Sequence, residues 1–268
     1  MIPNALTSLL ATGSGGLVGL VLGLLGGGGS ILAVPLLVYV VGVSQPHVAI
    51  GTSAVAVAAS ALGNLLPHWR AGNVKWRCAA VFGAAGVLGS FAGAAAAKGL
   101  DGQKLLALFG LVMIAIGGLM LRKRASLGDP NVRLSLKTAR KLLPLLLSIG
   151  FGVGVFSGFF GIGGGFLIVP GLILATGMPL TSAVGTSLVS VAAFGAATAF
   201  SYALSDLIDW PLAAFFVAGG LLGGVAGVTL GKSLQAHKGM LNAIFASLVI
   251  GLGLYIVWKG YATLGGGV

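Results

Sequence analysis

Apolar runs of about 18 to 20 residues recur from one end of this 268-residue chain to the other, separated by short polar or glycine-rich breaks. The composition agrees with this pattern, since 57% of the residues are hydrophobic, 7% are charged and the mean hydropathy is +1.09. A water-soluble domain of this size could not expose such a surface without aggregating. The sequence therefore predicts an all-α membrane protein that crosses the lipid bilayer many times and has no soluble domain.

The charged residues exclude several other functions. The formal net charge is +11, but the Lys and Arg residues lie between the apolar runs, where they set membrane topology, so nucleic-acid binding is not expected. The chain has no Glu and four acidic residues, all in predicted loops: Asp101, Asp129, Asp206 and Asp209. Cation transporters and proton pumps usually keep carboxylates within the membrane. This shortage disfavours a permease for cations or metals.

No pattern of an enzyme is present in the sequence. There is no Walker A sequence, no His-rich or Cys-rich metal-binding pattern, and no nucleophile with a base at a recognisable spacing. The single cysteine, Cys78, cannot form an internal disulfide. We therefore expect no catalytic residues, no metal and no cofactor.

The chain also contains an internal repeat with an offset of about 134 to 136 residues. The segment from Gly23 to Ser30, followed by Val34-Pro35, matches the segment from Gly158 to Gly165, followed by Val169-Pro170. Further matches pair Gly51-Thr52-Ser53 with Gly185-Thr186-Ser187, and Trp76 with Trp210. The predicted organisation is a first membrane repeat at 1–124, a cytoplasmic linker at 125–141 and a second membrane repeat at 142–268.

Each repeat contains five apolar segments, which predicts opposite membrane orientations for the two halves. An odd number of crossings turns the second copy upside down, as in the inverted repeats of many secondary transporters. The segments lie at about 6–25, 30–43, 46–66, 77–97 and 104–121 in the first half, and at about 142–160, 166–177, 179–203, 211–231 and 240–258 in the second.

The charges of the loops predict the same opposite orientation of the two halves. Basic residues in the 67–77 loop, the 122–141 linker and the 232–238 loop place all three in the cytoplasm. The 204–210 loop carries Asp206 and Asp209 without Lys or Arg, and is expected outside. Both termini are then expected outside as well.

The second segment of each repeat is short for a membrane crossing. As helices, Ser30 to Val43 would span about 21 Å and Phe166 to Gly177 about 18 Å, against a hydrocarbon core of about 30 Å. Such lengths favour re-entrant or broken helices, which persist at membrane depth only where protein or a watery cavity surrounds them. A full crossing between tilted neighbours is the alternative.

The two glycine-rich breaks are the first candidates for a binding site. Glycine permits unusual backbone angles and close approach of N–H groups to a ligand, and the helix that follows adds the positive end of its dipole. This combination suits an anion. The candidate residues are Gly28, Gly29 and Ser30, where Ser30 is suited to cap the new helix, and Gly163, Gly164 and Gly165 in the second half. The alternative is that these glycines only allow close helix packing.

The two Gly-Thr-Ser segments supply candidate hydroxyl donors, namely Thr52 and Ser53 with Thr186 and Ser187. Each pair lies roughly 8–12 Å below one of the opposite membrane surfaces. We expect all four elements, two glycine breaks and two Gly-Thr-Ser segments, to approach one central zone and bind an anion there. The alternative is that these hydroxyls bond to carbonyls of their own helix. Asn64, with Thr198 at its equivalent position, is a weaker candidate.

Taken together, the paired glycine motifs and Gly-Thr-Ser segments resemble the sulfite exporter TauE/SafE family of membrane permeases over nearly the whole chain. The sequence departs from a perfect repeat at Ile162, where the first half has Gly27. The resemblance implies transport of sulfite or a related organosulfur anion, such as a sulfonate, at the bacterial cytoplasmic (inner) membrane. The expected partners are thus a small anionic substrate and the lipid bilayer.

Export from the cytoplasm is the expected direction, because a potential of about 100 mV, negative inside, drives each negative charge outward with about 2.3 kcal/mol. The alternatives are a non-transporting membrane scaffold or subunit, or a permease for another small solute or a metal cation. The sequence leaves open which anion is carried, whether a second ion is coupled, and whether the protein is a homo-oligomer.

Overall fold

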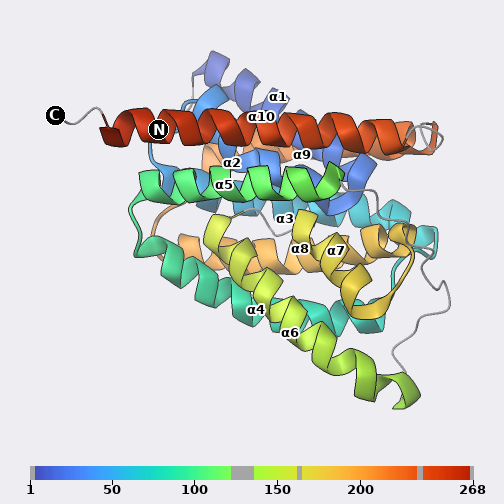
Figure 1. Ribbon diagram of the computed structural model, residues 1–268. Helices are drawn as coiled ribbons and strands as arrows, with labels where there is room; N and C mark the ends of the chain where they lie inside the picture. The colour runs from blue at the N-terminus through green and yellow to red at the C-terminus, as the bar shows by residue number, and fades with distance from the viewer. Residues whose placement is uncertain (1–3, 122–135, 162–164, 234–237, 266–268) are drawn as a thin grey trace.

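A computed structural model describes residues 4–121, 136–161, 165–233 and 238–265, and these described residues form helices joined by short connections, without strands (Figure 1). The prediction of an all-α protein is confirmed. The first half contains α1 (Ala5–Leu25), η1 (Gly26–Leu32), α2 (Ala33–Pro35), η2 (Leu36–Val40), α3 (Pro46–Arg70), α4 (Trp76–Lys98) and α5 (Gly102–Leu121). The second half contains α6 (Leu136–Phe160), α7 (Gly165–Thr176), α8 (Leu180–Ala203), α9 (Trp210–Ser233) and α10 (Lys238–Gly265).

Eight helices of the described part are long and apolar enough to cross a membrane. The two remaining apolar stretches, Gly28–Val40 and Leu167–Thr176, are shorter, as the sequence predicts for the second segment of each half. Large apolar side chains cover the outside of the bundle, and Leu9, Leu174 and Leu222 are each more than 70% exposed. Lipid is the solvent that stabilises such a surface.

Helix α6 extends beyond the apolar run into the sequence of the predicted linker. Helix α6 begins at Leu136, inside the range expected as linker (125–141), whereas the apolar run begins at 142. Lys and Arg have high helix propensity, so the helix extends through Lys137, Arg140 and Lys141 beyond the apolar segment. The rest of that linker, up to residue 135, lies outside the described residues.

Glycines bring two pairs of helices into backbone contact. An added Cβ at Gly19 of α1 would overlap Gly220 of α9, and one at Gly154 of α6 would overlap Gly86 of α4. In membranes, small residues allow this close approach, and dispersion contacts then hold the helices together. Both pairs are parallel, because the contacts advance in the same direction along each helix, as from Gly15 opposite Phe216 to Gly19 opposite Gly220.

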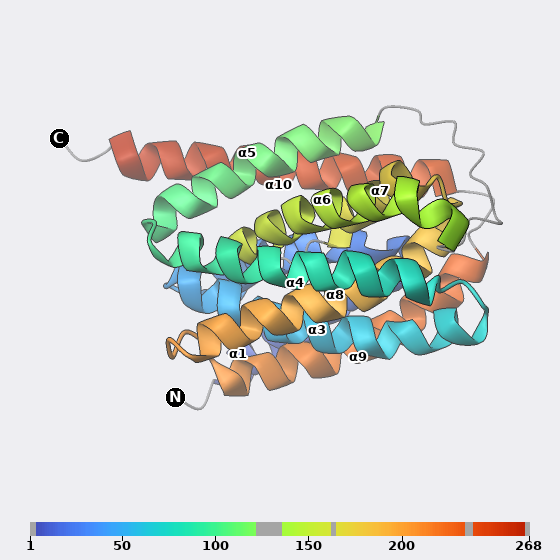
Figure 2. The same ribbon diagram turned by 90° about the horizontal axis from the view of Figure 1, so that it is seen from below.

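The other main pairs are antiparallel. In α8, Gly195 lies against Ala54 and Ala58 of α3, whereas Tyr202 lies against Gly51. Helices α5 and α10 also run side by side in opposite directions (Figures 1 and 2). Helices α3 and α8 occupy equivalent places in the two sequence repeats, as do α5 and α10, so equivalent helices oppose each other in direction.

The bundle has two ends with different charges. The Asp209 end carries the 204–209 connection, the start of α1 and the end of α10, and the Lys75 end carries the 71–75 connection (Figures 1 and 2). The acidic residues of the described part, Asp101, Asp206 and Asp209, belong to connections at the Asp209 end. The four Trp residues are exposed at the two ends, Trp69 and Trp76 at one and Trp210 and Trp258 at the other, as expected for interfacial belts.

Candidate functional site

The first glycine-rich break folds back against the helix that precedes it. Helix α1 ends at Leu25 and η1 follows as a 3₁₀ stretch, within which Gly28, Gly29 and Ser30 are buried. A Cβ at Gly29 would lie 2.7 Å from the Val18 carbonyl oxygen, so η1 packs against the backbone of α1. Helical structure begins before Ser30, so Ser30 is not the first residue of a new helix, and the predicted capping role is wrong.

The second break lies between α6 and α7. Gly161 has φ +67°, a conformation that residues with a Cβ rarely adopt, and its carbonyl side faces the start of α3. An added Cβ there would also overlap Ile50. Gly165 is the buried first residue of α7, and the predicted site residues Gly163 and Gly164 lie outside the described residues.

The threonines of the Gly-Thr-Ser segments make equivalent contacts in the two halves. The Asp209 backbone N–H donates to Thr52 Oγ1 at 3.0 Å, and the Lys75 backbone N–H donates to Thr186 Oγ1 at 3.0 Å. Asp209 precedes α9, and Lys75 precedes α4. Thr52 of the first half therefore holds the start of α9 in the second half, and Thr186 of the second half holds the start of α4 in the first half. Helices α4 and α9 occupy equivalent places in the two repeats.

The serines of these segments bond to carbonyls. Ser53 Oγ donates to the Ile50 carbonyl at 2.8 Å and is also 3.0 Å from the Gly161 carbonyl of the other half. Ser187 Oγ donates to the Val184 carbonyl of its own helix at 2.8 Å. This is the local bonding that the sequence left as an alternative. The protons of both serines are thus engaged with backbone oxygens.

The structure brings the predicted site residues together as two groups. Ser53 meets the second glycine break near the Asp209 end, whereas Ser187 lies near the Lys75 end, where Gly185 packs against Asn73. Along α8, the distance from Ser187 to Tyr202, which lies level with Gly51, is about 22 Å at a rise of about 1.5 Å per residue. The two Gly-Thr-Ser segments therefore lie at different depths of the bundle, because each sits in the first turns of one of two antiparallel helices.

Further polar side chains are buried between the helices without a hydrogen-bond partner. Among the described residues these include Asn64 Nδ2, Ser157 Oγ, Ser190 Oγ and Thr198 Oγ1. Sequence reasoning missed Ser157 and gave Asn64 and Thr198 little weight. A pattern was available, because Asn64 follows Ser53 by eleven residues and Thr198 follows Ser187 by eleven, which places each pair on one helix face.

Basic groups lie near both ends of the core. Lys98 Nζ donates to the Ser201 carbonyl at 3.0 Å and to Ser205 Oγ at 3.1 Å, close to the Asp209 end. Arg70, Lys75 and Arg77 lie at the Lys75 end. The basic residues at the Lys75 end have no acidic neighbours among the described residues of that end, so they favour the approach of an anion there.

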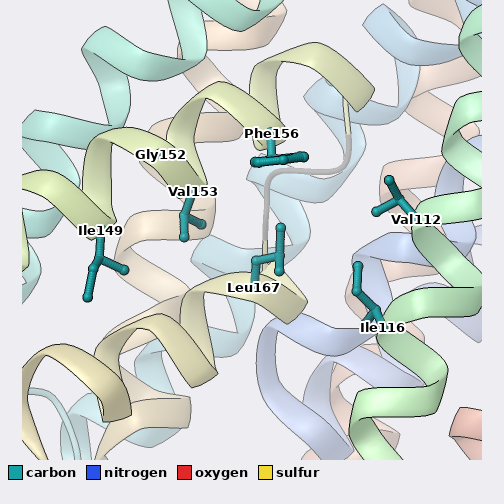
Figure 3. A pocket seen from close by; sticks show the side chains of 7 residues that line it. All are labelled: Val112, Ile116, Ile149, Gly152, Val153, Phe156 and Leu167. Carbon is teal, nitrogen blue, oxygen red and sulfur yellow. The ribbon is translucent and has the colours of Figure 1, made fainter.

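An apolar groove of about 380 Å³ opens between α5, α6 and α7 (Figure 3). Its lining presents almost no polar surface and consists of Val112, Ile116, Ile149, Gly152, Val153, Phe156 and Leu167. A charged solute would lose its hydration there without gaining a hydrogen bond. The groove is therefore unsuited to a charged solute, and the buried polar groups lie elsewhere in the bundle.

A bundle of lipid-exposed helices that encloses polar groups at two broken helices has the architecture of a membrane transporter. Within the described part, no three His, Cys, Asp or Glu side chains group as a metal site. The profile of the sulfite exporter TauE/SafE family matches residues 11–256, and the chain belongs to this family. It is a multi-pass membrane transporter for a small solute, not an enzyme.

Similar proteins carry the same general description. A "Probable membrane transporter protein" of Xylella fastidiosa (strain 9a5c) is 50% identical, covering 96% of this chain and 98% of the relative. The probable membrane transporter YunE of Bacillus subtilis is 28% identical, covering 91% and 95%. MJ0441 of Methanocaldococcus jannaschii, also named a probable membrane transporter, is 30% identical over 64% of each chain. No solved structure matches the chain.

Proposed function

We propose that this transporter carries sulfite or a related small organosulfur anion, such as a sulfonate, out of the cytoplasm across the inner membrane. The observation that carries the proposal is the chemistry of the buried core. Helix breaks and neutral hydroxyl and amide groups meet there, whereas the acidic residues of the described part lie in connections outside the spans. Neutral donors can bind an anion and exchange it for water, and the family name agrees with an oxyanion substrate.

The proposed path includes the residues that the sequence nominates. These are Gly28, Gly29, Ser30, Thr52 and Ser53, with Gly163, Gly164, Gly165, Thr186 and Ser187 in the second half. The contacts described above give them different tasks: Thr52 and Thr186 fix helix starts, and Ser53 fixes the second break. The glycines allow backbone to approach the solute closely.

We further propose that the halves are inverted repeats and that the Lys75 end faces the cytoplasm. The opposed directions of α3 and α8 and of α5 and α10 support the first point. The clustering of acidic residues at the Asp209 end and of Arg70, Lys75 and Arg77 at the Lys75 end supports the second. The start of α1 and the end of α10 would then lie outside, and the short segments would be re-entrant.

Export follows from the proposed orientation and charge. A potential of about 100 mV, negative inside, drives each exported negative charge with about 2.3 kcal/mol. Uptake against this field would need a coupling ion, and carboxylates that bind such ions are absent from the described spans.

The test is flux through the purified protein in liposomes. Sulfite or methanesulfonate should cross faster than in protein-free vesicles, and an imposed potential should accelerate flux toward the positive side. Absence of flux for a broad anion panel, with folded protein in the membrane, would favour a non-transporting scaffold. Flux that requires a metal cation would instead favour a cation permease.

A further inference from the structure

Two buried hydroxyl groups near the second helix break have no hydrogen-bond partner. Ser157 on α6 and Thr198 on α8 are both 0% exposed, and neither Ser157 Oγ nor Thr198 Oγ1 has a partner in the structure. Burial of a hydroxyl without a partner destabilises a protein, and a group left in that state calls for an explanation.

The two hydroxyls lie at the same depth in the bundle. On α6, Gly158 packs against Ser90 of α4, and four residues before Ser90 on α4, Gly86 packs against Phe194 of α8. Because α4, α6 and α8 are parallel, Ser157 is level with about residue 198 of α8. The pairing of α8 with α3, where Gly195 lies against Ala54, independently places Thr198 beside Ser53.

Both hydroxyls also lie near the first turns of α3. Thr198 lies between Gly195 and Tyr202 along α8, and both of these residues contact α3, so Thr198 is on the α3 face. Ser157 precedes Gly161 by one turn, and Gly161 contacts Ile50 of α3. We call the set Ser53, Ser157, Gly161 and Thr198 the Ser53 cluster.

Within the Ser53 cluster, the hydroxyl protons are not equally available. Ser53 directs its proton toward the carbonyls of Ile50 and Gly161. Ser157 and Thr198 have no such acceptor, so their protons are the ones that a ligand with exposed oxygen atoms can accept. Lys98, which bonds to the Ser201 carbonyl one turn beyond Thr198, adds positive charge on the same side of the bundle.

We propose that Ser157 and Thr198 are the principal donors that hold the transported oxyanion at the Ser53 cluster. The proposal rests on the function proposed above and assigns the binding step to two residues outside the glycine and Gly-Thr-Ser motifs. Each hydroxyl donates one hydrogen bond to an oxygen atom of the anion, and no residue changes its covalent structure or net charge.

The test uses Ser157→Ala and Thr198→Val, which remove the hydroxyls at nearly constant volume. Ser190→Ala is the matched control. Ser190 is also buried without a partner, but it lies on the α4 face of α8, between Thr186, which bonds to Lys75, and Phe194, which stacks on Phe82. Two quantities are measured with sulfite and methanesulfonate: the concentration for half-maximal flux in liposomes, and the anion-dependent rise in melting temperature in detergent.

Each of the two substitutions should raise the half-saturating concentration about fivefold, corresponding to about 1 kcal/mol for one hydrogen bond, and should reduce the anion-dependent stabilisation. Ser190→Ala should change neither. If the parent transports and both substitutions leave affinity and stabilisation unchanged, the assignment is wrong while the proposed function stands. An equal loss in Ser190→Ala would likewise overturn it, because the effect would then reflect packing.

The readouts also separate the two proposals from each other. A parent that shows no flux, but is stabilised by sulfite in a manner that Thr198→Val abolishes, would support the binding site and overturn the transport proposal. Neither flux nor stabilisation with either anion would overturn both.

Discussion

The two Gly-Thr-Ser regions are alike in their backbone contacts and different in the polar side chains beside them. Thr52 and Thr186 make equivalent hydrogen bonds. Each accepts from the backbone N–H of the residue before a helix of the other half, α9 for Thr52 and α4 for Thr186. Beyond that the halves diverge. Gly158 matches Gly23 in the repeat, so the position of Ser157 is taken by buried Leu22 in the first half, and Thr198 is answered by Asn64.

The duplicated halves therefore share their backbone contacts more closely than their polar side chains. The Ser53 cluster holds two hydroxyls without partners, and the region of Ser187 holds the amide of Asn64, which lies against Gly224 of α9. A solute that passes both regions therefore meets different donors at the two ends. We expect the two regions to differ in affinity, and the following experiments test that comparison.

The largest expected effect is in cysteine labelling, where a membrane-impermeant reagent should reach one end of the bundle from outside the cell and not the other. Single cysteines introduced as Gly72→Cys and Leu207→Cys, with Cys78 replaced by Ala, should be labelled by a membrane-impermeant maleimide from opposite sides. In whole cells Leu207→Cys should react and Gly72→Cys should react only after permeabilisation. Labelling of both from one side would contradict the inverted orientation of the two halves.

Next in size is the loss of the second helix break. Gly161→Val should reduce transport by at least about tenfold, because the valine would be strained at φ +67° and would overlap Ile50. Gly152→Val on α6, the helix that precedes Gly161, is the matched control, since a Cβ at Gly152 meets no atom within 4 Å. Flux and melting temperature are measured together. Parental flux in folded Gly161→Val would show that this break is not required.

A smaller and equal effect is expected for the two threonines. Thr52→Val and Thr186→Val should each destabilise the folded protein by about 1 kcal/mol, because each leaves a backbone N–H without its acceptor. Reversible unfolding in mixed micelles measures the change. Thr229→Val is the control, because the hydroxyl of Thr229 is exposed and bonds only to carbonyls of its own helix. Clearly unequal losses would argue against equivalent roles in the two halves.

The smallest effect separates the two serines. Ser53→Ala removes a hydrogen bond between the halves, whereas Ser187→Ala removes only a bond within α8. Ser53→Ala should therefore be less stable than Ser187→Ala by about 0.6 kcal/mol, a typical value for hydrogen bonds between membrane helices. The same unfolding assay measures the difference. A larger loss of stability for Ser187→Ala would contradict the greater contribution expected of the Ser53 hydrogen bond between the halves.

The class of fold could be predicted from the amino-acid sequence. Long apolar runs leave the backbone in lipid no alternative to helices, so eight long helices, two short ones and their approximate limits followed from hydropathy. The repeat also identified Thr52 and Thr186 as corresponding residues.

Which of the candidate polar groups lie close together depends on how the helices pack, and the sequence does not give that packing. A hydropathy pattern shows where each residue lies along its own helix. It does not show which helices pack together or in which register. The parallel pairing of α6 with α4 and the antiparallel pairing of α3 with α8 brought Ser157 to the level of Thr198 and separated Ser53 from Ser187 by about half the length of α8. These registers follow from glycine contacts between helices distant in sequence, where close packing of backbone against backbone selects one arrangement.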